Sequence, residues 1–437
     1  MINIVYYNMF QPVENKLPFT YISEYLGLLF LILIPLNIRI TSQFYIHDIL
    51  APLMLLCLLL YLLGNWREFF NPVLFYLYAF LIVILILTIF HYKNTTDIYE
   101  LGIFSYMILI FLFFLFFPLS IKKIKYYGIT VIVVIFIFFV ITEICNVNIK
   151  HQVYDNSSLQ ILTNRFFFTF EHPNLLGSFY VLPIICVLLG FYTLLQKIYF
   201  KYFILFLILL SLVCLPLLFT ASKHILLSVG VVLAVLYSRK ECLYLNIVRY
   251  CIWIGLVLLF IIFYLTVLFP FFPLKQSFPY INIETLGMYT IHQEIYLKMI
   301  LHNWNTFLFG IGRANIFQLY PQLATHEEIY SILSQYNLPQ LTSTFTRYMD
   351  AHNEFLNIGA SFGVIAVGVL YLFIFKTKQM IKTKLLQKQI LVFFIAVLFM
   401  VSFWDDILSK RWIWISLGII LSQLRLLENN KTQRITD

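Results

Sequence analysis

The pair His352-Asn353 stands where a polar segment meets a long apolar stretch, in the sequence DAHNEFLNIGASFG. A histidine side chain changes its charge near neutral pH, so it can accept the proton of an attacking hydroxyl group. Asn353 can cap the helix that follows or hold a substrate hydroxyl. Gly359 and Gly363 would let another helix approach closely. The alternative interpretation is a helix cap without chemistry.

Two cationic residues lie beside other apolar stretches and suit a phosphate-bearing substrate. Arg165 shortly precedes Pro173-Asn174, which opens an apolar stretch, and its planar guanidinium group can hold a phosphate. Lys223 lies in a short polar break between two apolar stretches, where an ionisable group is costly and indicates function. The alternatives are an arginine that reaches the lipid headgroups and a tight turn with an exposed lysine.

A third group of candidates lies in the polar segment 271–351. The sequence Gly310-Ile311-Gly312-Arg313 permits a tight turn with exposed backbone N–H groups, which can form a small anion-binding nest. A plain turn is the alternative. Arg347 adds a cation later in the same segment. Near the end of the chain, Asp405-Asp406 is most simply a solvated loop, with a divalent cation site as the alternative.

The composition identifies the elements that must position these residues. The chain has 437 residues, of which 62% are hydrophobic and 11% charged, whereas a soluble chain is about half apolar and about a quarter charged. This excludes an ordinary cytosolic enzyme, a disordered protein and, despite the net charge of +9, a nucleic-acid binder. A spanning helix needs about 20 apolar residues, and the chain holds about twelve such stretches.

The backbone must satisfy its own hydrogen bonds in lipid, so these stretches predict an all-α polytopic membrane protein. The predicted spans are 20–36, 48–64, 71–91, 99–118, 128–146, 173–196, 202–219, 223–238, 250–270, 355–375, 389–404 and 412–427. Residues 1–437 thus form a single integral membrane domain with one large loop, 271–351. Within that loop, residues 284–303 predict an amphipathic helix, lying on the membrane surface or packed on the spans.

Lysines and arginines set the predicted orientation. With a cytoplasmic N-terminus, the inner loops and tails hold 18 of them and the short outer loops hold 7. Cytoplasmic loops carry the excess of positive charge. The sequence therefore predicts that both termini are cytoplasmic and that the large loop 271–351 is extracytoplasmic.

These motifs, in this order and on this topology, resemble the O-antigen ligase/polymerase family of bacterial polytopic membrane glycosyltransferases. The residues that carry the resemblance are Arg165, Phe170, Pro173 and Asn174; Thr220, Ser222 and Lys223; Gly310 and Gly312; and His352, Asn353 and Gly363. Two positions depart from the family pattern: Lys223 stands where the family usually has arginine, and His292 stands where it often has one.

The resemblance implies transfer of an undecaprenyl-diphosphate-linked glycan to a saccharide acceptor at the outer face of the bacterial inner membrane, in O-antigen (lipopolysaccharide) or capsule assembly. No cofactor, metal or nucleic acid is expected, and a chain-length regulator protein is a candidate partner beside the lipid bilayer. His352 is the predicted base, and Asn353 orients the substrate. The predicted diphosphate-binding residues are Arg165, Lys223, Arg313, Arg347 and His292, and the predicted turn and packing residues are Gly310, Gly312, Asn174 and Gly363.

Within the family, a polymerase adds repeat units to a lipid-linked chain, whereas a ligase moves the finished chain to lipid A core. The sparse and partly substituted cations favour a polymerase, with the O-antigen ligase as the alternative. A flippase for lipid-linked glycans is the alternative of another class. Arg165, Lys223 and His352 should surround one outward cavity in an enzyme, whereas a flippase needs a charged path through its middle.

Overall fold

The computed structural model describes residues 18–36, 38, 40, 45–66, 72–91, 95–144, 176, 179–195, 283–335, 342–345, 351, 353–380 and 410–436. These residues form helices and no β-strand, which confirms the predicted all-α class. In this part of the chain, four helical segments are long and apolar enough to cross a membrane: Ile46–Asn65, Leu74–His91, Ile121–Ile141 and Glu354–Lys376. The predicted spans 202–219, 223–238, 250–270 and 389–404 lie outside the described residues.

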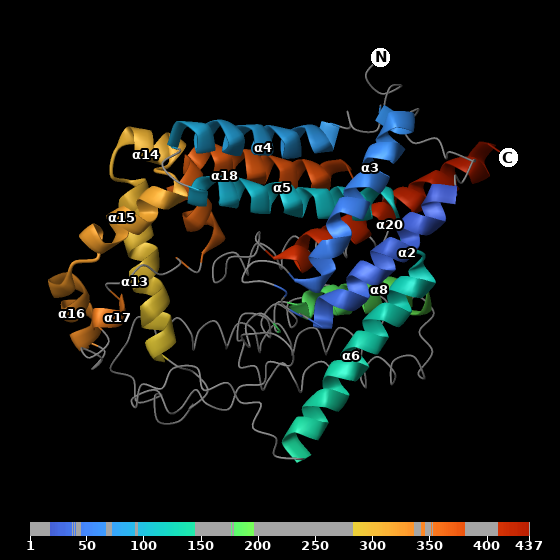
Figure 1. The fold of residues 1–437 in the computed structure, drawn as a ribbon, viewed down its shortest axis with the longest axis horizontal. Helices are drawn as coiled ribbons and strands as arrows, with labels where there is room; N and C mark the ends of the chain where they lie inside the picture. The colour runs from blue at the N-terminus through green and yellow to red at the C-terminus, as the bar shows by residue number, and fades with distance from the viewer. Residues whose placement is uncertain are drawn as a thin grey trace, which may run out of the picture.

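The described helices are named here by the labels of Figure 1. In chain order they are α2 (Pro18–Leu33), η2 (Ile34–Leu36), η3 (Ile46–Leu50), α3 (Ala51–Asn65), α4 (Pro72–His91), α5 (Thr95–Phe116), α6 (Ile121–Ile144), α8 (Val181–Leu195), α13 (Ile283–Ile300), α14 (Trp304–Phe309), α15 (Arg313–Leu323), α16 (His326–Gln335), α17 (Thr342–Phe345), α18 (Glu354–Met380) and α20 (Arg411–Thr436).

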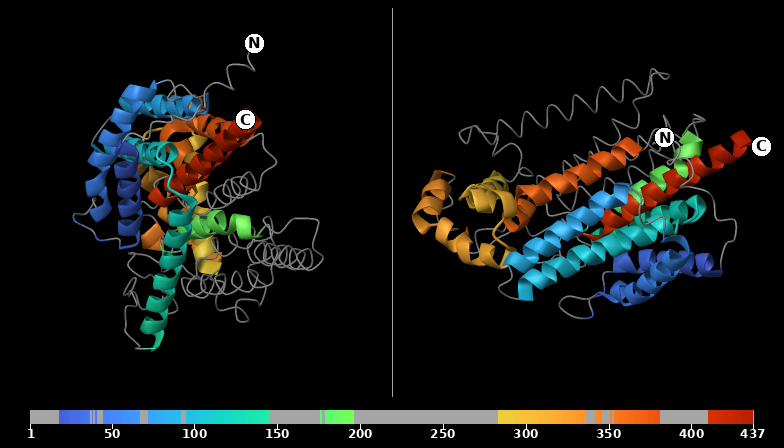
Figure 2. Two further views of the ribbon diagram at one scale, coloured as in Figure 1. Left: turned by 90° about the vertical axis from the view of Figure 1, so that its right-hand side faces the viewer. Right: turned by 90° about the horizontal axis from the view of Figure 1, so that it is seen from above.

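The apolar helices pack as a bundle in which α5 pairs with α20, α18 with α4, and α6 with α8 (Figures 1 and 2). Two of these pairs approach closely at a glycine. A Cβ on Gly128 of α6 would lie 2.7 Å from the carbonyl oxygen of Pro183 in α8, and one on Gly418 of α20 would lie 2.9 Å from that of Phe111 in α5. Small residues of this kind allow helices in lipid to gain van der Waals contact.

Helix α6 begins at Ile121, seven positions before the predicted start at 128. The lysines predicted to lie in a loop therefore occupy the first turns of the helix. Lysine favours helix, and its long side chain keeps the ammonium group in a polar environment. Lys123 confirms this, because its Nζ atom lies 2.9 Å from the carboxylate of Glu24 in α2.

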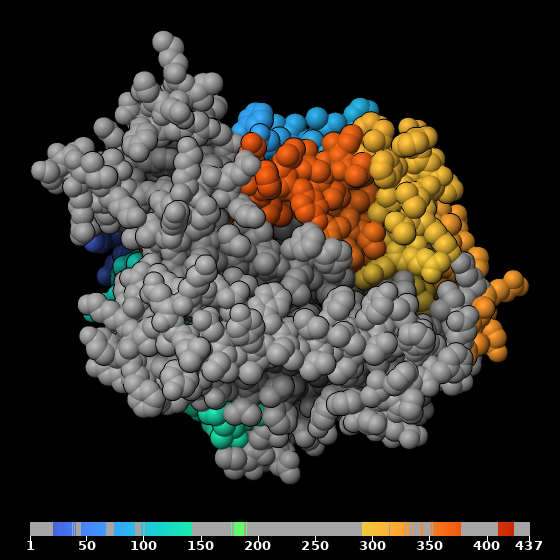
Figure 3. Space-filling model, turned by 180° about the vertical axis from the view of Figure 1, so that it is seen from behind, coloured from blue at the N-terminus to red at the C-terminus, as the bar shows by residue number. Residues whose placement is uncertain are grey.

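Helices α13 to α16, from the large loop, cover one end of the bundle and are called the cap below (Figure 1). Helix α20 ends at the opposite end of the bundle (Figures 1 and 2). Figure 3 shows α18 (orange) beside both α4 (blue) and the cap (yellow) on the rear face. Ile291, Ile295 and Met299 of α13 are buried in a core that the cap shares with Ala360 of α18. The amphipathic pattern thus marks a helix packed on its neighbours.

Candidate active site

The turn between α14 and α15 joins the cap to α18 by its backbone. Gly310 and Gly312 have φ of 73° and 79°, a region that glycine enters without steric cost. The N–H groups of Ile311 and Gly312 donate to the carbonyl oxygens of Ala360 and Ser361, at 2.8 and 3.0 Å. Because these N–H groups are already bonded within the protein, the turn is not an open anion nest.

Gly363 completes this junction from the side of α18. Its φ of 76° and ψ of 174° interrupt the helix and produce a kink. A Cβ at Gly363 would lie 2.1 Å from the carbonyl oxygen of Leu308, and one at Gly310 would lie 2.5 Å from the nitrogen of Phe362. The turn and the kink therefore fit together only where both glycines lack a side chain.

The end of α4 closes the junction on a third side. The Nε2 atom of His91 lies at hydrogen-bond distance, 3.1 Å, from the carbonyl oxygen of Phe309. A Cβ on Gly312 would lie 2.7 Å from the Cβ of His91. His91 was not among the residues predicted from the sequence. Its position as the last residue of an apolar stretch could have marked it as a candidate.

The first turn of α18 holds several buried polar groups. Asn353 is buried and caps the helix, because its Oδ1 atom accepts from the N–H of Leu356 at 3.2 Å. The N–H of Ala351 donates to the Oδ1 atom of Asn357 at 3.4 Å. The Nδ2 atom of Asn357 is buried and has no hydrogen-bond partner. His352 itself lies outside the described residues, but both of its neighbours are buried and tied to α18.

His292 lies inside the cap, not on its surface. The side chain is fully buried, and its Nδ1 atom shares a short hydrogen bond with the hydroxyl of Tyr320 on α15. The sequence predicted that His292 binds diphosphate. The buried position leaves no surface of His292 for such a ligand, so we assign the residue to the packing of α13 on α15.

Arg313 is the described member of the predicted cationic set. It is the first residue of α15, directly after the glycine turn, and its side chain is partly exposed. The positive end of the helix dipole adds to its charge. Arg165, Lys223, Arg347 and Asn174 lie outside the described residues, so the predicted common cavity stays a prediction.

An ion pair inside the bundle was not foreseen. Arg411, at the start of α20, donates to the carboxylate of Asp48 in η3 at 2.9 Å, and the Tyr106 hydroxyl donates to the same carboxylate at 2.6 Å. The guanidinium group also lies over the ring of Tyr45, 4.8 Å from its centroid. Asp48 and Arg411 are mostly buried, with exposed fractions of 7% and 18%. The pair connects the early and last helices of the bundle.

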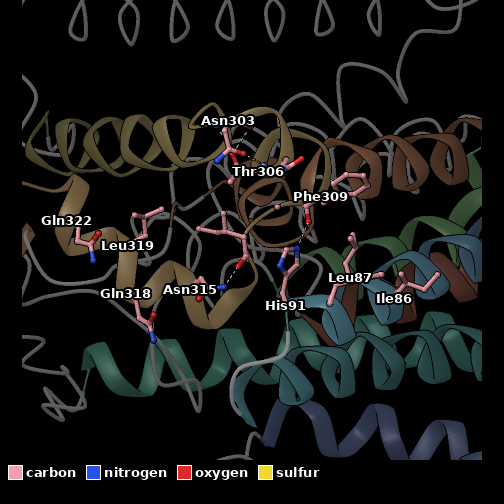
Figure 4. Close-up of a pocket in the computed structure, with 14 residues that line it drawn as sticks. Ile86, Leu87, His91, Asn303, Thr306, Phe309, Asn315, Gln318, Leu319 and Gln322 are labelled. Carbon is pink, nitrogen blue, oxygen red and sulfur yellow. Dashed lines mark hydrogen bonds between the residues drawn. The ribbon is translucent and has the colours of Figure 1, made fainter.

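A cavity of about 660 Å³ opens beside the glycine turn, between α4, α14 and α15 (Figure 4). One wall is apolar and consists of Ile86, Leu87 and Phe90 at the end of α4. The facing wall is rich in amide side chains: Asn303, Asn305, Asn315, Gln318 and Gln322. Among the described residues, no group of three or more His, Cys, Asp or Glu side chains could hold a metal ion.

Residues 206–372 match the model of a family described as O-antigen ligase. Over this segment the chain is similar to that family, which supports the O-antigen ligase/polymerase family. The resemblance predicted from the sequence is thereby confirmed. No curated protein and no solved structure matches the chain. The family and the apolar helices together support an integral membrane glycosyltransferase of the O-antigen ligase/polymerase type, with a lipid-linked glycan as substrate.

Proposed function

We propose that this chain is a member of the O-antigen ligase/polymerase family and that it transfers an oligosaccharide from undecaprenyl diphosphate to a sugar hydroxyl at the outer face of the bacterial inner membrane. The observation that carries the proposal is the family match over 206–372. The matched segment contains most of the predicted site: Lys223, Gly310, Gly312, Arg313, Arg347, His352, Asn353 and Gly363.

In this proposal His352 takes the proton from the acceptor hydroxyl as that oxygen attacks the first sugar carbon of the donor. The bond from this carbon to the diphosphate oxygen breaks, and undecaprenyl diphosphate leaves. Direct displacement inverts the configuration at the sugar carbon. The proposal is supported by the two neighbours in sequence, Ala351 and Asn353, which are buried and hydrogen-bonded to the first turns of α18.

The leaving diphosphate gains negative charge as the bond breaks, and fixed cations stabilise such charge. We assign this role to Arg165, Lys223, Arg313 and Arg347. Arg313 has support from its place at the first turn of α15, beside the glycine junction. No metal or cofactor is required in this scheme, because the lipid diphosphate is already an activated leaving group.

The first experiment measures transfer by the purified protein in proteoliposomes, with lipid-linked oligosaccharide extracted from the source cells as donor. We expect His352→Ala to lower the rate of undecaprenyl diphosphate release by about 100-fold or more, the usual contribution of a general base. His326→Ala is the matched control, since His326 is exposed on α16, and it should keep the wild-type rate. Full activity of His352→Ala would contradict the assignment of the base.

A second candidate function is that of an O-antigen ligase, which is how the matched family is described. Polysaccharide gels from cells without the gene, and from cells with His352→Ala, separate the two reactions. Short chains of one repeat unit in both strains would indicate a polymerase, the reaction we favour. Long chains stranded on the lipid carrier would indicate a ligase. Polysaccharide of unchanged length and attachment would overturn the transferase and favour the flippase.

A further inference from the structure

The cavity beside the glycine turn combines a largely apolar lining with several amide side chains and no fixed charge. No Asp, Glu, Lys or Arg side chain is among its lining residues. Two of its amides serve the backbone: Asn303 caps α14 by accepting from the N–H of Thr306 at 2.9 Å, and the Asn315 amide donates to the carbonyl oxygen of Ile311. In the described part of the chain, no hydrogen bond holds the amides of Asn305, Gln318 and Gln322.

These three amides are positioned for a ligand. Gln318 and Gln322 are four residues apart on α15, so they lie on one face of that helix, and Figure 4 shows both beside the cavity. Asn305 lies in the first turn of α14 and lines the same cavity. Each amide offers two N–H donors and one carbonyl acceptor. Together they match a ligand whose surface alternates hydroxyl donors and acceptors.

The apolar part of the lining, from both α4 and α14, can contact the remaining surface of the ligand. Phe90 and Phe309 line the cavity and are 79% and 42% exposed. Exposed rings of this kind provide an apolar surface against which the C–H face of a sugar ring can pack. A site with an apolar wall and a few placed polar groups is the usual form of a small-molecule pocket. The end of α4 is also the end of the apolar segment Leu74–His91, which is long and apolar enough to cross a membrane.

We propose that this cavity is a saccharide subsite, which holds neutral sugar units of the glycan through Asn305, Gln318 and Gln322 and packs them against Phe90 and Phe309. This inference depends on the proposed function for the source of the glycan. A diphosphate is a poor alternative occupant, because it would meet no lysine or arginine among the lining residues. A lipid chain alone is also a poor occupant, because it would leave the amides without partners.

The test is a binding measurement that does not require turnover. The probe is the free oligosaccharide released by mild acid from the lipid-linked pool of the source cells, titrated calorimetrically into the wild-type protein in lipid nanodiscs. We expect the double substitution Gln318→Leu with Gln322→Leu to raise the Kd about ten-fold, because two hydrogen bonds are lost. Inorganic pyrophosphate should not compete with the oligosaccharide.

Ser331→Leu is the matched control, because Ser331 is an exposed polar residue of the cap on α16, outside the cavity. Its Kd should equal that of the wild type. The subsite is overturned by an unchanged Kd in the double variant, by absence of oligosaccharide binding to the wild type, or by competition from pyrophosphate. Those results would leave the proposed transferase function intact if the wild type shows transfer in the proteoliposome assay. Saccharide binding lost in the double variant, without transfer by the wild type, would keep the subsite and reject the transferase.

Discussion

The bundle and the cap are held by different kinds of contact. Within the bundle, most contacts are between large apolar side chains, such as Phe111 packed edge-to-face against Trp414 with ring centroids 6.0 Å apart, beside the close approaches at Gly128 and Gly418. The cap shares a small apolar core with Ala360 of α18, and it also meets α18 through backbone hydrogen bonds and the glycines Gly310 and Gly363. Apolar cores accept changes that conserve volume, whereas a backbone junction accepts no additional atom. The same chain therefore combines a tolerant region with an intolerant one.

The largest effect on stability should come from breaking the ion pair between Asp48 and Arg411 inside the bundle. Arg411→Ala leaves the carboxylate of Asp48 buried without its cation, and breaking a buried pair in this way costs about 3–5 kcal/mol. The measurement is the free energy of unfolding in detergent. Lys123→Ala, which breaks a partly exposed pair with Glu24, is the control and should cost about 0–1 kcal/mol. An equal loss of unfolding free energy in the two variants would show that the buried pair contributes no more to stability than the partly exposed pair.

The next effect tests the junction itself. Gly363→Ala introduces a Cβ against the carbonyl of Leu308 and forces a side chain into a glycine-only backbone region. We expect a loss of about 2–4 kcal/mol, faster proteolysis of the cap, and loss of transfer. Gly368→Ala on the same helix is the control, since a Cβ there meets nothing within 4 Å. Equal rates of cap proteolysis and equal rates of transfer in the two variants would show that the junction does not need a glycine at position 363.

A smaller effect is expected inside the cap. Tyr320→Phe removes the hydroxyl that bonds the buried ring of His292, and an unsatisfied buried polar atom costs about 1–2 kcal/mol. Thermal unfolding should therefore shift downward. Tyr330→Phe serves as the comparison, because Tyr330 is 50% exposed and its hydroxyl can bond to water. An unchanged transition in Tyr320→Phe would remove the packing role assigned to His292.

The smallest effect belongs to the apolar contacts of the bundle. Ile84→Val on α4 deletes one buried methyl group, which costs about 1 kcal/mol. Ile82→Val on the same helix, where the side chain is 55% exposed, should cost less. Transfer should persist in both. A loss of transfer in Ile84→Val would contradict the tolerance attributed to the bundle.

Composition was sufficient to predict the all-α class, because apolar runs in lipid permit few other backbone structures. The start of α6 was misplaced, because lysines were assigned to a loop although the helix continues through Lys122 and Lys123. Local hydropathy reports where a helix is apolar, and not where its hydrogen bonds end.

The candidate site was less accessible from the sequence. Gly310, Gly312 and Gly363 were identified by type, but their mutual contact depends on a kink in α18 that no local pattern reveals. Asp48 and Arg411 are 363 positions apart, so their pairing needs the folded bundle. His292 was interpreted by analogy with an arginine, and its burial depends on Tyr320 in another helix.

The hydrogen bonds on either side of position 352 have a consequence for catalysis. Ala351 is bonded to Asn357, and Asn353 caps the first turn of α18, so the chain before and after this position is tied to one rigid element. The conformational entropy of ordering this backbone is lost once, during folding, and not again at each encounter with substrate. If the reacting group proposed at this position is His352, such preorganised neighbours would lower the entropic cost of reaching the transition state.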